Sequence, residues 1–277
     1  MFKNLWEASG LAQGLWQNYV MILISFVLMY LAIVKKFEPL LLLPIAFGMF
    51  IINIPGARDI VWGQTDADGN FIGDRGLLGY LYFGVEKVIY PPLIFMGIGA
   101  MTDFGPLIAN PKSMQIGAAA QLGVFLTFVG AVILGFDAAA AASIAVIGGA
   151  DGPTAIYLTQ ALSAFTNEDL LATIAIAAYS YMALIPIIQK PIMKLMTTKK
   201  ERAIKMKQLR EVTKIEKIIF PLLVTLVVGL LLPDAIPLLG MLMLGNLMRE
   251  SGVVGRLSSQ AQNGLMNTIT IFLGVCV

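Results

Sequence analysis

The sequence contains no histidine and a single cysteine, Cys276. Without histidine the chain has no imidazole to ligate a metal, shuttle a proton or act as a general base. One cysteine excludes an internal disulfide framework and a cysteine-based zinc site. The chain also lacks a Walker motif and any serine–histidine or cysteine–histidine pair. Proton or cation chemistry must therefore rest on carboxylates, tyrosines, hydroxyl groups, backbone carbonyls and water.

Charged residues are scarce as well. They make up 13% of the 277 residues, whereas a soluble globular chain has roughly 25%. Hydrophobic residues make up 58%, and the mean hydropathy is +0.81. A water-soluble domain of this length has no core large enough for so many apolar side chains. We therefore predict an all-α polytopic membrane protein that is surrounded by the lipid bilayer and has no nucleic acid partner.

Apolar runs long enough for a membrane-crossing helix, or nearly so, recur along the chain. A broken apolar segment covers residues 138–158, with the sequence GGADGP at its middle. We expect crossing helices over residues 19–34, 40–54, 88–101 (with a start near residue 78), 114–134, 170–188, 218–232, 236–247 and 265–277.

The distribution of charge predicts the orientation. Ten of the nineteen Lys and Arg residues lie between residues 190 and 217, which places this loop in the cytoplasm. The acidic loop 57–79 suits the outside. Each crossing helix moves the chain to the other side of the membrane. Loop 57–79 and loop 190–217 then lie on their predicted sides only if residues 138–166 begin and end on the same side. Because non-helical backbone at membrane depth needs protein or water around it, we predict a re-entrant broken helix that enters from the outside.

A weak internal repeat adds to this topology. The sequence IFMGIGA at 94–100 resembles IFLGVCV at 271–277, although short apolar repeats also arise by chance. The two copies start on opposite sides, which indicates an inverted-repeat, transporter-like fold. We expect a first repeat at 1–189 with the re-entrant segment 138–166, a cytoplasmic basic linker at 190–217, and a second repeat at 218–277. The broken helix of the first repeat has no counterpart between residues 218 and 277, so we expect the second repeat to be truncated.

Asp151 is the most informative residue, because it lies between two apolar half-segments. Glycines let the backbone leave helical geometry, and Pro153 suits the start of the next half-helix. Exposed carbonyls and a carboxylate form an oxygen-rich site for sodium or for a proton relay. We predict Asp151 as a catalytic residue and Asp151, Gly149 and Thr154 as sodium ligands. The alternative is a helix N-cap, but a buried charge is costly at membrane depth, and both roles can coexist.

Further polar candidates lie in two other apolar segments. Tyr179 and Tyr181 stand in the middle of the expected helix 170–188, about 200° apart around its axis. A tyrosine hydroxyl inside a membrane needs a hydrogen-bond partner. Each of the two is therefore either a functional group or a tyrosine at the membrane interface. Asn246 and Ser251 follow a short apolar run, and form either a functional polar group or a helix exit.

The sequence GGADGPTAIY at 148–157 strongly resembles the signature of the beta subunit of sodium-pumping, biotin-dependent decarboxylases. These include the oxaloacetate, methylmalonyl-CoA, glutaconyl-CoA and malonate systems. Residues 35–44, 94–110, 178–186 and 245–252 fit the same family, and the resemblance covers essentially the whole chain. It implies that Asp151 is the aspartate of the broken helix and Tyr181 the functional tyrosine. The family's second broken helix has no counterpart here.

The resemblance also implies a mechanism. A carboxyltransferase alpha subunit moves a carboxyl group from the acyl substrate, which it selects, to biotin on a carrier subunit. The beta subunit then decarboxylates carboxybiotin, consumes a proton and exports sodium. The implied cofactors are the sodium ion and carboxybiotin. The implied partners are the alpha subunit, the biotin carrier, a small membrane gamma or delta subunit and further copies of the chain, at the prokaryotic inner membrane.

Two other functions compete with this interpretation. A secondary transporter of an organic anion would share the inverted repeat but carry out no decarboxylation. A non-catalytic assembly or anchor subunit would not need Asp151 in a broken apolar segment. The specific signature at 148–157 favours the decarboxylase.

Overall fold

The computed structural model describes residues 10–36, 39–66, 71–166, 170–205 and 210–276. Regular structure in these ranges is helical, apart from one antiparallel hairpin of β1 (Gly63–Thr65) and β2 (Phe71–Arg75). Gly63 pairs with Arg75 and Thr65 with Phe71. The hairpin lies in the acidic loop 57–79.

The chain divides into two compact units, residues 1–89 with 268–277, and residues 90–267. These units are defined by internal packing, whereas the predicted repeats 1–189 and 218–277 are defined by similarity between segments. The repeats therefore stay a prediction.

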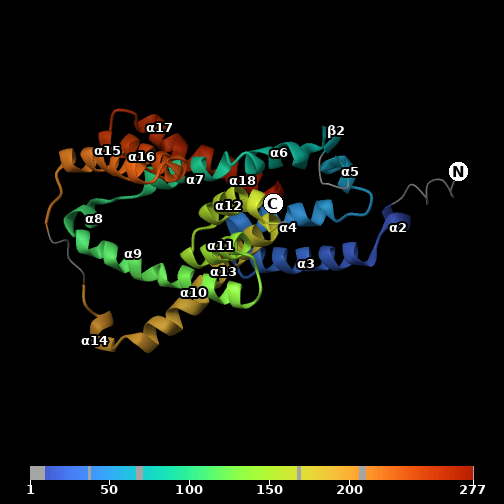
Figure 1. Ribbon diagram of the computed structural model, residues 1–277, viewed down its shortest axis with the longest axis horizontal. Helices are drawn as coiled ribbons and strands as arrows, with labels where there is room; N and C mark the ends of the chain where they lie inside the picture. The colour runs from blue at the N-terminus through green and yellow to red at the C-terminus, as the bar shows by residue number, and fades with distance from the viewer. Residues whose placement is uncertain (1–9, 37–38, 67–70, 167–169, 206–209, 277) are drawn as a thin grey trace. The chain divides into compact units, whose positions relative to one another are not determined.

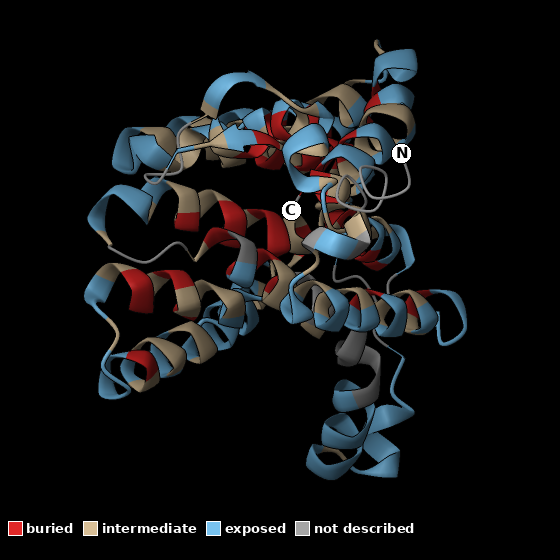
Figure 2. Ribbon diagram, turned by 90° about the vertical axis from the view of Figure 1, so that its right-hand side faces the viewer, coloured by how far each residue is buried: buried red, intermediate tan, exposed pale blue. Residues whose placement is uncertain are grey.

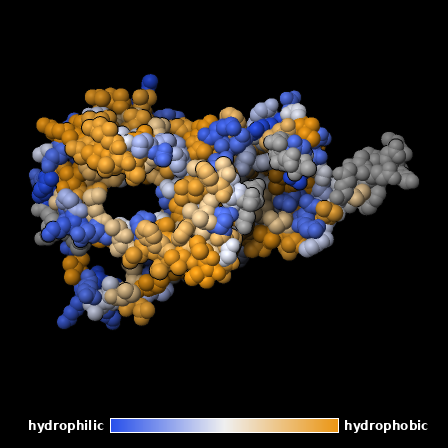
Figure 3. All heavy atoms as spheres, in the orientation of Figure 1, coloured by the Kyte–Doolittle hydropathy of each residue, from blue (hydrophilic) through white to orange (hydrophobic). Residues whose placement is uncertain are grey.

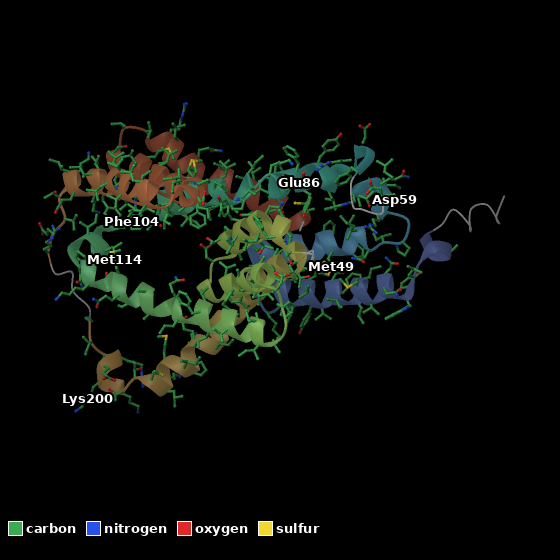
Figure 4. The ribbon with its side chains drawn as sticks, in the orientation of Figure 1. Met49, Asp59, Glu86, Phe104, Met114 and Lys200 are labelled. Carbon is green, nitrogen blue, oxygen red and sulfur yellow. The ribbon has the colours of Figure 1, made fainter. Side chains whose placement is uncertain are left out.

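The first unit is built from α-helices and the β1–β2 hairpin. Its helices are α2 (Gly10–Gln13), α3 (Trp16–Ile33), α4 (Pro39–Ile52), α5 (Arg58–Val61), α6 (Leu77–Glu86) and the greater part of α18 (Met266–Cys276). The helices α3 and α4 lie side by side (Figure 1), with the rings of Phe26 and Phe50 5.3 Å apart. Glu86, labelled at the end of α6 in Figure 4, forms an ion pair with Arg75 at 2.8 Å.

The second unit contains the broken segment. Its elements are α7 (Tyr90–Met101), α8 (Gly105–Ala109), η1 (Pro111–Ser113), α9 (Met114–Ala120), α10 (Leu122–Ile133), α11 (Ala138–Ala145), η2 (Val146–Gly149), α12 (Gly152–Leu162), η3 (Ser163–Phe165), α13 (Leu171–Met196), α14 (Lys199–Arg202), α15 (Lys214–Leu231), η4 (Pro233–Ala235), α16 (Ile236–Ser251), α17 (Gly255–Gln260) and the π-helical turn η5 (Ala261–Leu265).

Close packing of α7 against α16 organises one part of this unit. A Cβ atom at Gly99 would lie 1.8 Å from the Leu242 carbonyl oxygen, and one at Gly245 would lie 2.0 Å from that of Met96. Only glycine allows the two backbones to approach this closely, as at many helix contacts in membranes. Figure 1 shows α15, α16 and α17 gathered beside α7. The C-terminal ends of α7 and α16 are thereby brought together.

The surface of the protein is that of a membrane protein. Among the described residues, the helix α3 and the helical stretch Pro111–Ile133 are each long and apolar enough to cross a membrane, and α6 with α7 qualifies when the two are taken together. Exposed residues (pale blue) line most helices in Figure 2, and apolar side chains (orange) cover much of the face in Figure 3. Lipid is the solvent that accommodates such a surface. The prediction of a helical membrane protein is confirmed.

Individual boundaries differ in places from the prediction. The stretches 19–34 and 114–134 correspond to α3 and to Pro111–Ile133. The helix expected to end at residue 188 continues as α13 to Met196. Within the predicted basic linker the structure describes the short basic helix α14, on which Figure 4 labels Lys200.

Candidate functional site

The broken segment is a hairpin whose two ends are joined. The helices α11 and α12 pack against each other. At the base, Asp137 Oδ1 accepts a hydrogen bond from the Ala140 amide and Asp137 Oδ2 accepts one from the Thr166 hydroxyl, both at 2.8 Å. Residues 137 and 166 are therefore neighbours in space. This is the arrangement that the charge distribution requires for a segment that begins and ends on one side of a membrane.

The tip of the hairpin carries an unusual backbone conformation. After the 3₁₀ turn η2, Ala150 adopts the left-handed region with φ 58° and ψ 38°. A side chain in this region costs about 1–2 kcal/mol. The left-handed residue of the break is therefore an alanine and not one of the glycines expected to bend the backbone there. Strained residues of this kind concentrate at functional sites.

Asp151 follows at the N-cap position of α12, in an extended conformation and partly buried. The Thr154 amide lies near its carboxylate without the geometry of a cap hydrogen bond. Instead, the Thr154 hydroxyl donates to Asp151 Oδ2 at 2.5 Å. Two of the three predicted sodium ligands, Asp151 and Thr154, therefore present their oxygens together. The third, Gly149, lies two residues before Asp151 at the exposed end of η2.

Tyr181 approaches this site from α13. It packs against a buried cluster formed by Ala155, Ile174 and Ala178, which joins α12 to α13. Ala155 belongs to the turn of α12 that follows Asp151, because its amide donates to the Asp151 carbonyl at 3.1 Å. In the described part of the chain, the buried Tyr181 hydroxyl has no hydrogen-bond partner. The structure thus brings together the two residues predicted to carry the chemistry.

Tyr179 is the other tyrosine of α13. Its backbone is helical, and its side chain lies outside the described residues. Of the two tyrosines, only Tyr181 therefore has described side-chain neighbours that place it near the site.

The secondary candidates lie at a different place. The buried Asn246 side chain donates from Nδ2 to the carbonyls of Thr102 at 2.9 Å and Gly99 at 3.5 Å, and so satisfies the C-terminal end of α7. Ser251 donates from its hydroxyl to the Met248 carbonyl at 3.3 Å, in the last turn of α16. Asn246 therefore joins α7 to α16, and Ser251 is the last residue of α16.

An ion-pair group lies beside Asn246. Lys217 Nζ lies 3.0 Å from Asp103 Oδ1 and 3.8 Å from a carboxylate oxygen of Glu250. The Gly105 amide and the Lys217 ammonium hold the pKa of Asp103 below its usual value. Figure 4 labels the adjacent Phe104 between α7 and α8. The sequence does not indicate this group. Asp103 lies more than a hundred residues before Lys217 and Glu250, and Lys217 is the last residue of the predicted basic linker.

Comparison with known proteins completes the description. Residues 17–277 match the family described as the Na⁺-transporting oxaloacetate decarboxylase beta subunit. The chain is 54% identical to the glutaconyl-CoA decarboxylase subunit beta of Acidaminococcus fermentans, over 96% of this chain and 67% of the relative. It is 56% identical to the methylmalonyl-CoA decarboxylase subunit beta of Veillonella parvula, over 92% and 64%. It is 49% identical to the oxaloacetate decarboxylase beta chain of Klebsiella pneumoniae, over 93% and 70%. The chain thus spans about two thirds of the length of these relatives.

Proposed function

Because the chain belongs to the family of beta subunits of sodium-transporting decarboxylases, we propose that it decarboxylates carboxybiotin and couples this step to sodium export. In the reaction a proton replaces the carboxyl group on the biotin nitrogen, and carbon dioxide leaves. The named relatives are decarboxylase subunits, which supports this function rather than the transport of an organic anion.

The observation that carries the proposal is the pairing of Asp151 with Thr154 at the break, with Tyr181 beside them. When ionised, Asp151 binds sodium together with the Thr154 hydroxyl and the backbone carbonyl of Gly149. When neutral, it holds the proton that the decarboxylation consumes. Apolar surroundings favour the neutral carboxyl and a bound cation favours the carboxylate, so that the ion and the proton compete for the same oxygens.

Tyr181 acts in this scheme as a hydroxyl that contacts the substrate or the ion. Its hydroxyl is buried and has no partner among the described residues, although a buried polar group normally has one. A bound ion, a water molecule or the carboxylate of carboxybiotin would supply that partner. The predicted catalytic role of Tyr181 rests on this observation.

The same proposal includes the surroundings of the site. The family is described as Na⁺-transporting and its members are named as beta subunits, which supports a place in a membrane and a complex with other subunits, here an alpha subunit and a biotin carrier. We place this chain as a multi-pass protein in the prokaryotic inner membrane, with residues 138–166 as a re-entrant segment within inverted repeats. The alpha subunit selects the acyl substrate, a gamma or delta subunit joins the complex, and the chain associates with further copies of itself.

Asp151→Asn in the assembled complex tests the function. The substitution keeps the size of the side chain and removes its charge, so sodium-stimulated decarboxylation and sodium uptake into vesicles should fall together by more than about 100-fold. Tyr181→Phe should slow turnover roughly tenfold while the melting temperature stays unchanged. Near-normal, sodium-stimulated carbon dioxide release by Asp151→Asn would show that Asp151 is only a helix cap.

A further inference from the structure

Thr159 differs from three threonines whose hydroxyls bond to their own helix. The hydroxyls of Thr127 in α10, Thr225 in α15 and Thr102 just after α7 each donate to the carbonyl four residues earlier, at 2.7 to 2.8 Å. This bond is the usual way in which a helical threonine satisfies its hydroxyl without help from another element. Thr159 is only 4% exposed, and its Oγ1 has no hydrogen-bond partner in the described part of the chain.

A buried hydroxyl without a partner is destabilising, because it has given up its hydrogen bonds to water. Such groups are rare in native proteins, and each one points to an ion, a water molecule or a functional role. Thr159 and Tyr181 are the two residues whose side-chain oxygens are in this state among the described residues. They lie on α12 and α13, the two helices that pack together beside Asp151.

Thr159 lies between the site and one end of the hairpin. Asp151, Ala155 and Thr159 are spaced four residues apart, which places them along one side of α12. Thr159 is therefore about 12 Å further along the helix axis than Asp151. Beyond it, α12 ends at Leu162, and the chain reaches Thr166 at the base of the hairpin. The charge distribution assigns this base to the outer side of the membrane, where sodium is released.

We propose that the Thr159 hydroxyl is a sodium ligand on the path from Asp151 to the outer surface. This inference rests on the proposed function and assigns a second oxygen to the route of the ion. A hydroxyl oxygen is a hard ligand but carries no charge, so it stabilises a passing ion without trapping it. Transport requires this balance, because an ion must bind well enough to enter a site and weakly enough to leave it.

The experiment uses the assembled complex in proteoliposomes, with sodium controlled separately on the two sides. Thr159→Val removes the hydroxyl and keeps the branched shape, whereas Thr159→Ser keeps the hydroxyl. Thr127→Val is the matched control, because the Thr127 hydroxyl is already bonded to the Gly123 carbonyl. The readouts are the rate of sodium transport, the inhibition of decarboxylation by sodium on the release side, and the melting temperature.

Thr159→Val should lower the rate of sodium transport roughly tenfold, since it removes one oxygen that binds a charge. The concentration of release-side sodium that inhibits by half should rise by a similar factor. Thr159→Ser should restore both, and Thr127→Val should change neither. If Thr159→Val fails to assemble, Thr159→Ala removes the same hydroxyl with a smaller side chain and should give the same shifts.

Two outcomes would overturn the inference. In the first, Thr159→Val melts at a higher temperature and transports sodium normally, so that the hydroxyl is only an unpaired core group. In the second, Thr159→Ser is as impaired as Thr159→Val, so that packing is responsible. Asp151→Asn tests the proposed function separately. If Asp151→Asn is inactive and Thr159→Val transports sodium normally, the role of Thr159 is wrong and the proposed function still holds.

Discussion

The two half-helices of the broken segment each begin after an aspartate, and the two aspartates behave differently. Asp137 is exposed, and both of its carboxylate oxygens are occupied, by the Ala140 amide and the Thr166 hydroxyl. Asp151 is partly buried, and among the described residues its contacts come from Thr154 alone: the hydroxyl donates to Oδ2, and the amide lies near the carboxylate without the geometry of a cap hydrogen bond. The same position before a helix thus leaves the two carboxylates in different surroundings, and the proposed role of Asp151 rests on this difference.

The backbone before each aspartate differs in the same sense. Gly135 precedes Asp137 with φ 98°, a conformation that glycine adopts without steric cost. Ala150 precedes Asp151 with φ 58°, where a Cβ atom is unfavourable. The base of the hairpin is therefore relaxed and its tip is strained. A strained backbone with an underused carboxylate is typical of a site that is held ready for a ligand.

Removing the two carboxylates separately should produce the largest contrast. Asp137→Ala removes the contacts that close the hairpin, so the melting temperature should fall, while decarboxylation at saturating sodium should stay within about twofold. Asp151→Asn should have the opposite profile, with an unchanged melting temperature and no turnover. Thermal melting and carbon dioxide release measured on the same preparations give both values. If Asp137→Ala abolished turnover while the protein remained folded, the contrast between cap and site would be wrong.

Acid should weaken the base of the hairpin through Asp137. The Ala140 amide and then the Thr166 hydroxyl lower the pKa of Asp137. A carboxyl group with a lowered pKa in the folded state adds stability that is fully present above its unfolded value of about 4 and is lost as pH falls through the folded value. Asp137→Asn keeps a capping side chain that does not titrate. As pH falls below about 4, the melting temperature of the unmodified protein should therefore fall more than that of Asp137→Asn. A difference that stays constant with pH would contradict this account.

The sequence predicted those features that depend on composition or on neighbouring residues. Scarce charge and apolar runs predicted the helical membrane protein, and the GGADGP motif located the break. The helix α13 was predicted in the correct region but too short, because the basic residues after 188 were read as a loop. Helices can carry lysines along an apolar face into the interface, so the charges did not end the helix.

Contacts between distant segments were beyond the reach of the sequence. The hydrogen bond of Asp137 to Thr166 spans 29 residues, and that of Asn246 to Thr102 spans 144. Nothing in the residues themselves indicates these pairs, since asparagine and aspartate are equally common at ordinary helix ends. The unpaired Thr159 hydroxyl was also hidden, because a helical threonine normally bonds to its own helix. Only the arrangement of α12 and α13 shows which hydroxyl remains free.

The smallest expected effect concerns the strain at Ala150. In Ala150→Gly the left-handed conformation loses its cost of about 1–2 kcal/mol, while the unfolded chain gains conformational freedom worth about 0.5–1 kcal/mol. The variant should therefore be more stable by roughly 0.5–1 kcal/mol. Gly135→Ala is the matched control, because it introduces at the base the same strain that Ala150→Gly removes at the tip, and it should melt at a lower temperature. If Asp151 binds sodium as proposed, a more flexible residue before it should also raise the sodium concentration that Ala150→Gly needs for half-maximal decarboxylation. An Ala150→Gly variant that is less stable than the unmodified protein would show that the tip of the hairpin is not strained.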